Sequence, residues 1–144
     1  MIGWGIVGHE AAKFTPATEA LAREAIRSLL TEYISGVSVV SGKCHLGGID
    51  IWAVEEAQKL NIPWREFPPE HLSWEGGYKK RNIEIAYAAD CVVSIVVKEL
   101  PPSYHGMRFK SCYHCGTTSH VKSGGCWTAK YAKGLGKPIR IIEI

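Results

Sequence analysis

Three cysteines and one histidine near the end of the sequence have the types and spacing of metal ligands. They are Cys112, Cys115, His120 and Cys126, in the pattern C-x2-C-x4-H-x5-C. Three thiolates and one imidazole suit a closed tetrahedral zinc site, and a Cys-x2-Cys turn places both sulfurs on one side of a tight loop. The pattern therefore predicts a structural zinc ion.

Other assignments of these residues stay open. Cys126 falls where the last predicted helix begins, so His114 or a water could complete the shell instead. A Cys112–Cys115 disulfide or reduced, buried thiols would also account for the first pair. The segment resembles the zinc knuckle, C-x2-C-x4-H-x4-C, in the aromatic residue after the first cysteine and the glycine after the second, but its last spacing is one residue longer. Cys91 falls in a strand pattern and is expected in the core.

A glycine-containing loop forms a second candidate site. It follows the β-branched run at 37–40 and leads into a helical apolar pattern at 51–60. Backbone N–H groups at a helix N-terminus lack intrahelical partners and lie at the positive end of the helix dipole, so a phosphate is a natural ligand there. We expect Asp50 to be the helix N-cap and the glycines to approach the ligand, unless they serve only to turn the chain. The candidate contacts in this loop are Ser41, Gly42, Lys43, Gly47, Gly48 and Asp50.

Strand and helix patterns alternate along the chain and must position both sites. Strands are predicted at 2–7, 37–40, 63–67, 91–97 and 137–142, and helices from Pro16 to about Ser35-Gly36 and at 51–60, 82–89 and 127–135. Thr15 before Pro16 is a cap-plus-N1 signature. The alternation implies an α/β fold, a Rossmann-like doubly wound domain of about five mostly parallel strands with helices on both faces. Ligands of such folds lie at the carboxyl ends of the strands.

Length and composition fit a single domain spanning residues 1–144, with a Cys/His-rich insert at about 100–126. Apolar residues make up 46% and charged residues 22% of the chain, which excludes disordered and fibrous classes. The net charge of +3 permits a nucleotide or nucleic-acid partner without requiring one. No apolar run approaches the roughly 18 residues of a membrane span, and an odd number of cysteines, five, fits poorly with a secreted disulfide framework. We therefore expect a cytoplasmic protein with no membrane partner.

Three separated segments resemble, in order, the SLOG superfamily of Rossmann-like proteins. The loop SGKCHLGGID, beginning at Ser41, resembles the S-G-x-x-x-G-x-D pattern of that superfamily. The segment RNIEIAYAADCVVSI, beginning at Arg81, resembles its R-N-x-x-x-A-x-x-x-D-x-x-V segment. The segment SGGCWTAKYA, beginning at Ser123, resembles the S-G-x-x-x-T-A-x-x-A helix opening of the DNA-processing-A branch.

The resemblance implies a nucleotide-type ligand held by glycine loops at the sheet edge. Beyond the loop at 41–50, the candidate contacts are Gly8, His9, Arg81, Asn82, Ser123, Gly124, Gly125 and Thr128. Arg81 could form a paired contact to a phosphate, or could be a solvated arginine in the basic cluster at 79–81. His9 could reach the same edge or be solvated, and residues 123–125 could form only a tight helix entry.

The branches of this superfamily differ in function. Some bind single-stranded DNA and load recombinase; others, the lonely-guy phosphoribohydrolases, cleave the N-glycosidic bond of nucleoside monophosphates; still others act as ligand sensors. The hydrolases show P-G-G-x-G-T-x-x-E, and the glutamate of that motif is replaced here by Tyr131. A tyrosine cannot supply that carboxylate near neutral pH, so we predict binding without this reaction and assign no catalytic residue.

The Cys/His-rich insert also carries aromatic and basic side chains. They are Tyr104, Phe109, Tyr113 and Trp127, with Arg108, Lys110 and Lys122. Such groups stack unpaired bases and contact phosphates, so single-stranded nucleic acid is the second predicted partner, after a nucleotide-type small molecule. Alternatively, the aromatics pack the insert against the domain or against a second subunit of a homo-oligomer, which we also expect. A nucleoside-phosphate N-glycosidase is the third hypothesis.

Overall fold

A parallel β-sheet with helices on both faces organises the computed structural model, which describes residues 1–33 and 36–144. In these residues the strands are β1 (Ile2–Gly8), β2 (Val37–Ser41), β3 (Trp64–Glu66), β4 (Cys91–Val96) and β5 (Ile139–Glu143). Their order is β3-β2-β1-β4-β5, and every neighbouring pair is parallel. The predicted α/β, Rossmann-like fold is thereby confirmed.

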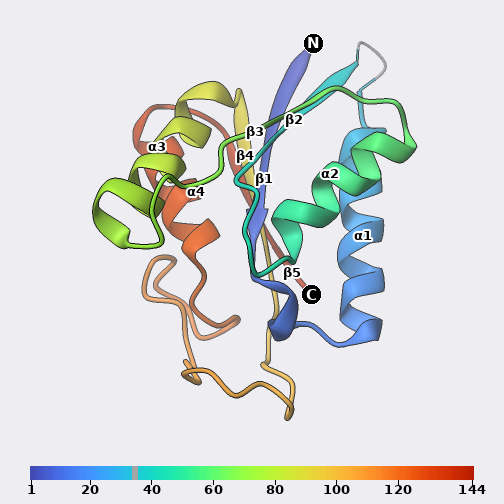
Figure 1. Cartoon of the computed structure of the whole chain (residues 1–144). Helices are drawn as coiled ribbons and strands as arrows, with labels where there is room; N and C mark the ends of the chain where they lie inside the picture. The colour runs from blue at the N-terminus through green and yellow to red at the C-terminus, as the bar shows by residue number, and fades with distance from the viewer. Residues whose placement is uncertain (34–35) are drawn as a thin grey trace.

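Two pairs of helices cover the sheet (Figure 1). The helices α1 (Pro16–Leu30) and α2 (Ile49–Lys59) lie on one face, and α3 (Lys79–Ala88) and α4 (Gly124–Gly134) lie on the other. A short 3-10 turn (Ala11–Lys13) precedes α1, and a π-helical turn (Trp74–Tyr78), here the 74–78 turn, precedes α3. No helix in the described part of the chain is both long and apolar enough to cross a membrane.

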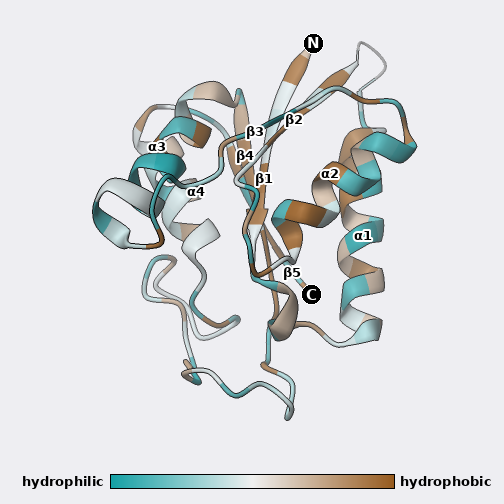
Figure 2. Ribbon diagram, viewed as in Figure 1, coloured by the Kyte–Doolittle hydropathy of each residue, from teal (hydrophilic) through white to brown (hydrophobic). Residues whose placement is uncertain are grey.

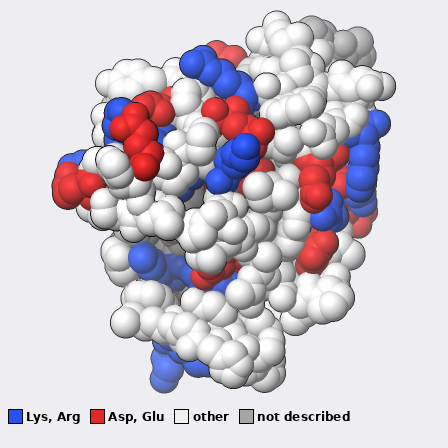
Figure 3. Space-filling view, in the orientation of Figure 1, with Lys and Arg blue, Asp and Glu red and all other residues white. Residues whose placement is uncertain are grey.

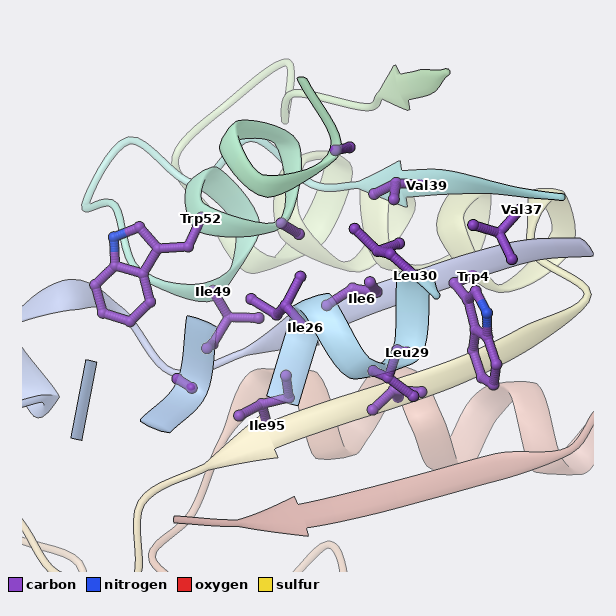
Figure 4. Packing of buried hydrophobic residues seen from close by; sticks show 14 of the residues in the cluster. Trp4, Ile6, Ile26, Leu29, Leu30, Val37, Val39, Ile49, Trp52 and Ile95 are labelled. Carbon is purple, nitrogen blue, oxygen red and sulfur yellow. The ribbon is translucent and has the colours of Figure 1, made fainter. Parts of the chain in front are cut away.

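The apolar core lies on both faces of the sheet. Every residue of β4 is buried, as expected for an inner strand of a parallel sheet, and Figure 2 shows apolar residues along the central strands. The larger cluster fills the space between the sheet, α1 and α2, where Ile6, Ile26 and Ile49 are fully buried (Figure 4). The smaller cluster lies under α3 and α4, where small side chains such as Ala129 and Ala132 permit close packing on the sheet.

The start of α1 follows the local capping rule that the sequence indicates. The Thr15 hydroxyl accepts from the Thr18 N–H at 3.1 Å, and the Thr18 hydroxyl accepts from the Thr15 N–H at 2.7 Å. The two residues therefore form a reciprocal capping box, with Pro16 at the first helical position.

The start of α2 differs from the prediction. Gly48 is the N-cap of α2, and Asp50 lies inside the first turn, so the assignment of Asp50 as the N-cap is wrong. Gly48 has a φ of 84°, and a Cβ on Gly48 would collide with the carbonyl oxygen of His9. Only glycine fits this close approach to the end of β1, and this contact fixes where the helix begins.

Other predicted boundaries also change. α1 ends at Leu30, well before the predicted stop, whose Ser35 lies outside the described residues. α4 begins at Gly124 rather than Trp127, because Ser123 caps the helix ahead of its two glycines. α3 likewise starts earlier than predicted, directly after the 74–78 turn.

The strand order reverses at β1, which places a crevice at the carboxyl ends of β1 and β4. The chain runs from β1 to β2 and β3 on one side and then returns to β4 and β5 on the other. Open α/β sheets bind ligands at such a switch point. The segment between β4 and α4, which holds the Cys/His-rich insert, extends beyond this same edge (Figure 1).

Candidate ligand pocket and metal centre

A pocket of about 240 Å³ opens at the carboxyl end of β1, between residues of α2, α3 and α4. Its wall brings together most of the residues predicted to contact a ligand. They are Gly8, His9, Asp50, Arg81, Asn82, Ser123, Gly124, Gly125 and Thr128. Segments that are far apart in the sequence therefore meet at the switch point of the sheet.

Arg81 is the buried cation of the pocket wall, and not a solvated member of the basic cluster. Its exposed fraction is 8%. Nε donates to Oδ1 of Asn82 at 2.8 Å, and Nη1 donates to the carbonyl oxygen of Gly42. The guanidinium also lies over the ring of Tyr78, 5.6 Å from its centroid. Nη2 forms no hydrogen bond with the residues that the structure describes, so it remains free to donate to an anion.

The carboxylate of Asp50 lies beside this guanidinium. Its Oδ2 is 3.8 Å from Nη1 of Arg81 and accepts a hydrogen bond from the N–H of Cys44 at 3.2 Å. Burial raises the pKa of Asp50 to about 6, although Arg81 and the Cys44 N–H act to lower it. A carboxyl group that titrates near neutral pH next to a buried cation in a cleft is typical of a functional site.

The first turn of α4 borders the pocket with its backbone. The N–H of Gly124 has no hydrogen-bond partner among the described residues, and a Cβ on Gly124 would meet no atom within 4 Å. Gly125 instead packs on the sheet, since a Cβ there would lie 2.7 Å from the nitrogen of Gly8 and 2.9 Å from Oγ of Ser94. The turn is therefore held against β1 and β4, while its N-terminal backbone borders open space.

His9 links three segments of the site and is not solvated. Its exposed fraction is 2%. Nδ1 accepts from the Val97 N–H at 3.0 Å, and Nε2 donates to the Lys122 carbonyl oxygen at 2.9 Å, which defines a neutral ring. Burial lowers the pKa of His9 to about 4. Because both ring nitrogens are used, His9 ties the end of β1 to the segments that follow β4 and precede α4.

Part of the predicted site does not line the pocket. These residues are Ser41, Gly42, Lys43, Gly47 and Gly48. The Ser41 hydroxyl donates to the carbonyl oxygen of Asp50 at 2.7 Å. A Cβ on Gly42 would lie 2.5 Å from Nη1 of Arg81, so glycine is needed there, whereas Lys43 is exposed. These residues thus support Asp50 and Arg81, while Cys44 and Leu46 of the same β2–α2 loop line the cavity.

The pocket also contains residues that the sequence patterns did not indicate. Trp74 and Tyr78, at the two ends of the 74–78 turn, line the same cavity as Arg81. The other lining residues are Val7, Glu10, Lys13, Cys44, Leu46 and Ile85. In the sequence, this turn is marked only by two aromatic residues on either side of Glu-Gly-Gly. The segment has neither the apolar period of a helix nor that of a strand, so its position in the site could not be predicted.

The four predicted metal ligands form one cluster. One ligand atom from each of Cys112, Cys115, His120 and Cys126 lies within 4.8 Å of all the others. The backbones of Cys112 and Thr117 exchange hydrogen bonds of 2.9 and 3.2 Å, which close the turn that carries the first two cysteines. Cys126 lies in the first turn of α4, so the cluster joins the insert to the helix that borders the pocket. The donor set fits a tetrahedral metal site.

Surrounding polar groups orient the ligands of this cluster. Nδ1 of His120 is 2.8 Å from the carboxylate of Glu143 on β5, and Nε2 is 3.7 Å from Sγ of Cys126. A carboxylate on the outer nitrogen of a metal-binding imidazole fixes its tautomer and orientation. Burial alone would raise the pKa of Cys112, but backbone N–H donors around its sulfur outweigh burial and lower it. This environment favours the thiolate form of Cys112, whereas burial raises the pKa of Cys115 and of Cys126.

Of the alternative assignments, the disulfide and the His114 ligand do not describe the structure, whereas reduced thiols agree with it, with Cys112 buried and Cys115 exposed. All five cysteines are free, so Cys112 and Cys115 form no disulfide. His114 is not part of the cluster and packs on Tyr113, with ring centroids 4.3 Å apart. Cys91 is buried in β4, as predicted.

The aromatic side chains of the insert contact one another and a lysine. The rings of Phe109 and Tyr113 are 6.5 Å apart, and the Lys122 ammonium lies 5.1 and 5.9 Å from their centroids. Phe109 packs against the large core cluster, as the packing alternative predicts, whereas 63% of Tyr113 is exposed. The predicted aromatic group thus divides between the core and the surface.

No protein-family model, curated protein or solved structure matches this chain.

Proposed function

We propose that this protein binds a small nucleotide-type ligand, and that Arg81 and the first turn of α4 hold an anionic group of that ligand. One observation carries the proposal: a buried guanidinium and a helix N-terminal N–H that has no partner among the described residues border one pocket at the carboxyl end of β1. A guanidinium makes charge-assisted, paired contacts with phosphate, and the helix dipole adds positive charge. The resemblance of three segments to the SLOG superfamily supports the same ligand class, and we include membership of that superfamily in the proposal.

The size of the pocket restricts the ligand. Its volume of about 240 Å³ is slightly below the range of roughly 300–1,000 Å³ for small-molecule pockets. One nucleotide unit, partly outside the pocket, therefore fits better than a dinucleotide. Asp50 would oppose an anion while it is ionised, and its raised pKa allows it to take up a proton when the ligand binds.

The test is isothermal titration of adenosine 5′-monophosphate into the wild-type protein and two variants. The Arg81→Lys variant keeps the charge but loses the planar fork, and we expect binding about tenfold weaker or more, since a hydrogen bond to a charged group contributes roughly 1.5–3 kcal/mol. Lys43→Ala is the matched control, because Lys43 is exposed and lies outside the pocket. Thermal melts verify folding. Unchanged affinity in Arg81→Lys would refute the assignment of the site.

We propose binding rather than cleavage of the glycosidic bond. Tyr131, at the position of the hydrolase glutamate, is not among the residues that line the pocket, and its ring stacks on Trp127 at 5.5 Å. The hydrolase hypothesis is tested by measuring release of free base from nucleoside monophosphates. Turnover that is lost in Arg81→Ala, with the fold intact, would support an enzyme at this pocket.

Single-stranded nucleic acid is the second candidate ligand. The specific observation is the exposed ring of Tyr113 next to the Lys122 ammonium on the insert. Binding of a polymer through several phosphates weakens steeply with salt, whereas a mononucleotide in a pocket depends on salt less. Oligonucleotide affinity that falls steeply with salt and is lost in Tyr113→Ala would favour this candidate.

We propose that the metal is zinc and that it has a structural role. Three thiolates with one imidazole form a closed site that leaves no position for substrate. Elemental analysis should find about one zinc per chain, and chelation should lower the thermal stability. A metal-free preparation of unchanged stability would exclude this role. The predicted homo-oligomer stays a prediction, which sedimentation can test.

A further inference from the structure

The 74–78 turn places an indole ring at the rim of the pocket. Trp74 lines the same cavity as Arg81, and yet 42% of its surface is exposed. Trp74 begins a row of aromatic rings that continues through Trp127 and Tyr131 to Tyr87. A contiguous aromatic surface that borders a polar pocket marks a binding surface more often than a single exposed residue does.

The ring of Trp74 is held in place before any ligand binds. It packs edge to face on Trp127, with centroids 4.9 Å apart and planes at 89°. Its backbone is also fixed, because the Tyr78 N–H donates to the carbonyl oxygen of Ser73 at 2.9 Å. At Gly77, a Cβ would collide with the carbonyl oxygen of His71, so the turn packs tightly on the preceding chain. A ring fixed in this way can stack on a ligand with little further loss of conformational entropy.

The pocket wall combines two kinds of chemistry. Arg81 and the N-terminus of α4 are polar and positively polarised, whereas Trp74 presents an aromatic surface. The pocket is too small for a whole nucleotide, so a ligand with its phosphate at Arg81 would leave its planar group at the rim. Figure 1 shows that the chain leading into α3 and the first turn of α4 lie on the same side of the sheet.

We infer that Trp74 is the base-stacking residue of this pocket, and that the ligand class is a nucleoside 5′-phosphate rather than a sugar phosphate. This inference rests on the proposed function, since it assumes that the anionic group lies at Arg81. Stacking of a base on an aromatic side chain is worth about 1–3 kcal/mol by alanine substitution, which corresponds to roughly five- to 150-fold in affinity.

The experiment compares the common ribonucleoside 5′-monophosphates with ribose 5-phosphate, by titration calorimetry and quenching of tryptophan fluorescence. Wild-type protein should bind at least one mononucleotide about fivefold or more tightly than ribose 5-phosphate. Trp74→Ala should remove this preference and leave the ribose 5-phosphate affinity unchanged, and Trp74→Phe should keep part of it. Trp64→Ala is the matched control, because Trp64 is also 42% exposed but lies on β3, outside the pocket.

The outcomes separate the two proposals. In one outcome, wild-type protein binds ribose 5-phosphate and every mononucleotide with equal affinity, and Arg81→Lys loses this binding. That outcome would overturn the role of Trp74 and would still support the anion site at Arg81. A Trp74→Ala variant with an altered sedimentation coefficient and unchanged affinities would assign the ring to a contact between copies, and would also overturn it. Failure of wild-type protein to bind any of these compounds would overturn both proposals. Trp74→Phe retains an aromatic ring against Trp127, so it provides an answer if Trp74→Ala does not fold.

Discussion

Two buried carboxylates on one helix, Asp50 and Glu56 of α2, have opposite protonation behaviour. Glu56 is fully buried and pairs with Arg23 and Arg27 of α1, at 2.9 and 2.6 Å, and with Lys59 at 2.9 Å. Burial alone would raise the pKa of Glu56, but hydrogen bonds from these three side chains lower it to about 2. Asp50 has a single guanidinium at 3.8 Å, and burial raises its pKa to about 6. Three cations outweigh the effect of burial on the pKa of Glu56, whereas a single cation does not outweigh it for Asp50.

The two groups also differ in what surrounds them. Glu56 joins α1 to α2, and Figure 3 shows acidic and basic side chains gathered together over these helices. Its charge is fully compensated, which is typical of a structural ion-pair network. Asp50 borders an open pocket and its charge is only partly compensated. Such an imbalance costs stability and is commonly retained at sites where a ligand or a proton completes the arrangement.

The largest expected effect is the loss of stability in Glu56→Gln. A pKa of about 2 in the folded protein, against an unfolded value of about 4.3, corresponds to about 3 kcal/mol of unfolding free energy at pH 7. Because the folded pKa is lowered, this contribution is present above about pH 4.5 and disappears as the pH falls towards 2. Urea unfolding at several pH values measures it.

Glu55→Gln is the matched control for that measurement. Glu55 pairs with the same Arg23 at 2.9 Å, but its side chain is exposed, so we expect a loss below about 1 kcal/mol. Equal losses in the two variants would show that the buried network contributes no more than a surface ion pair.

A smaller effect is expected for Asp50→Asn, whose stability should depend on pH differently from that of the wild-type protein. Between about pH 4 and 6 the folded protein holds a proton on Asp50 that the unfolded chain has released, so this group makes stability fall as pH rises. His9 acts in the opposite direction, because the unfolded chain holds a proton that the buried ring does not. In Asp50→Asn only the effect of His9 should remain, so the stability of the variant should rise with pH. Between about pH 4 and 6, its free energy of unfolding should increase relative to that of the wild type by about 1.4 kcal/mol per pH unit. Parallel stability curves would mean that Asp50 titrates normally.

The smallest expected effect concerns anion binding. Sulfate does not titrate in this range, and its affinity for the wild-type protein should rise as the pH falls from 7 to 5, since protonation of Asp50 removes a negative charge beside Arg81. In an open, solvated pocket, one charge about 4 Å from the anion is worth on the order of 1 kcal/mol, which corresponds to about fivefold in affinity. Asp50→Asn should bind sulfate with little dependence on pH. An equal pH dependence in both proteins would assign the effect to another group.

The sequence was sufficient to predict the fold and the Cys/His cluster, because both leave regular spacings. Alternating apolar periods predicted the parallel sheet, and the cysteine spacing predicted a cluster that the structure brings together. The assignment of Asp50 as an N-cap failed because it considered only the residue type, whereas the contact of Gly48 with the end of β1 fixes the helix start. The environment of Glu56 was also hidden, because two of its three cations come from α1, 29 and 33 residues earlier. Trp74 was not predicted as a site residue, because the apolar residues of its turn follow neither the helix nor the strand spacing.

The position of Cys126 couples the two sites. It follows Gly125 directly in the first turn of α4, so one helical turn contains both a proposed zinc ligand and part of the pocket wall. If zinc and a nucleotide both bind as we propose and both stabilise this turn, the two are thermodynamically linked: the factor by which zinc raises nucleotide affinity equals the factor by which the nucleotide raises zinc affinity. A chelator that strips zinc from the free protein should therefore be needed at a higher concentration when the pocket is full, and scarcity of zinc should lower occupancy of the pocket.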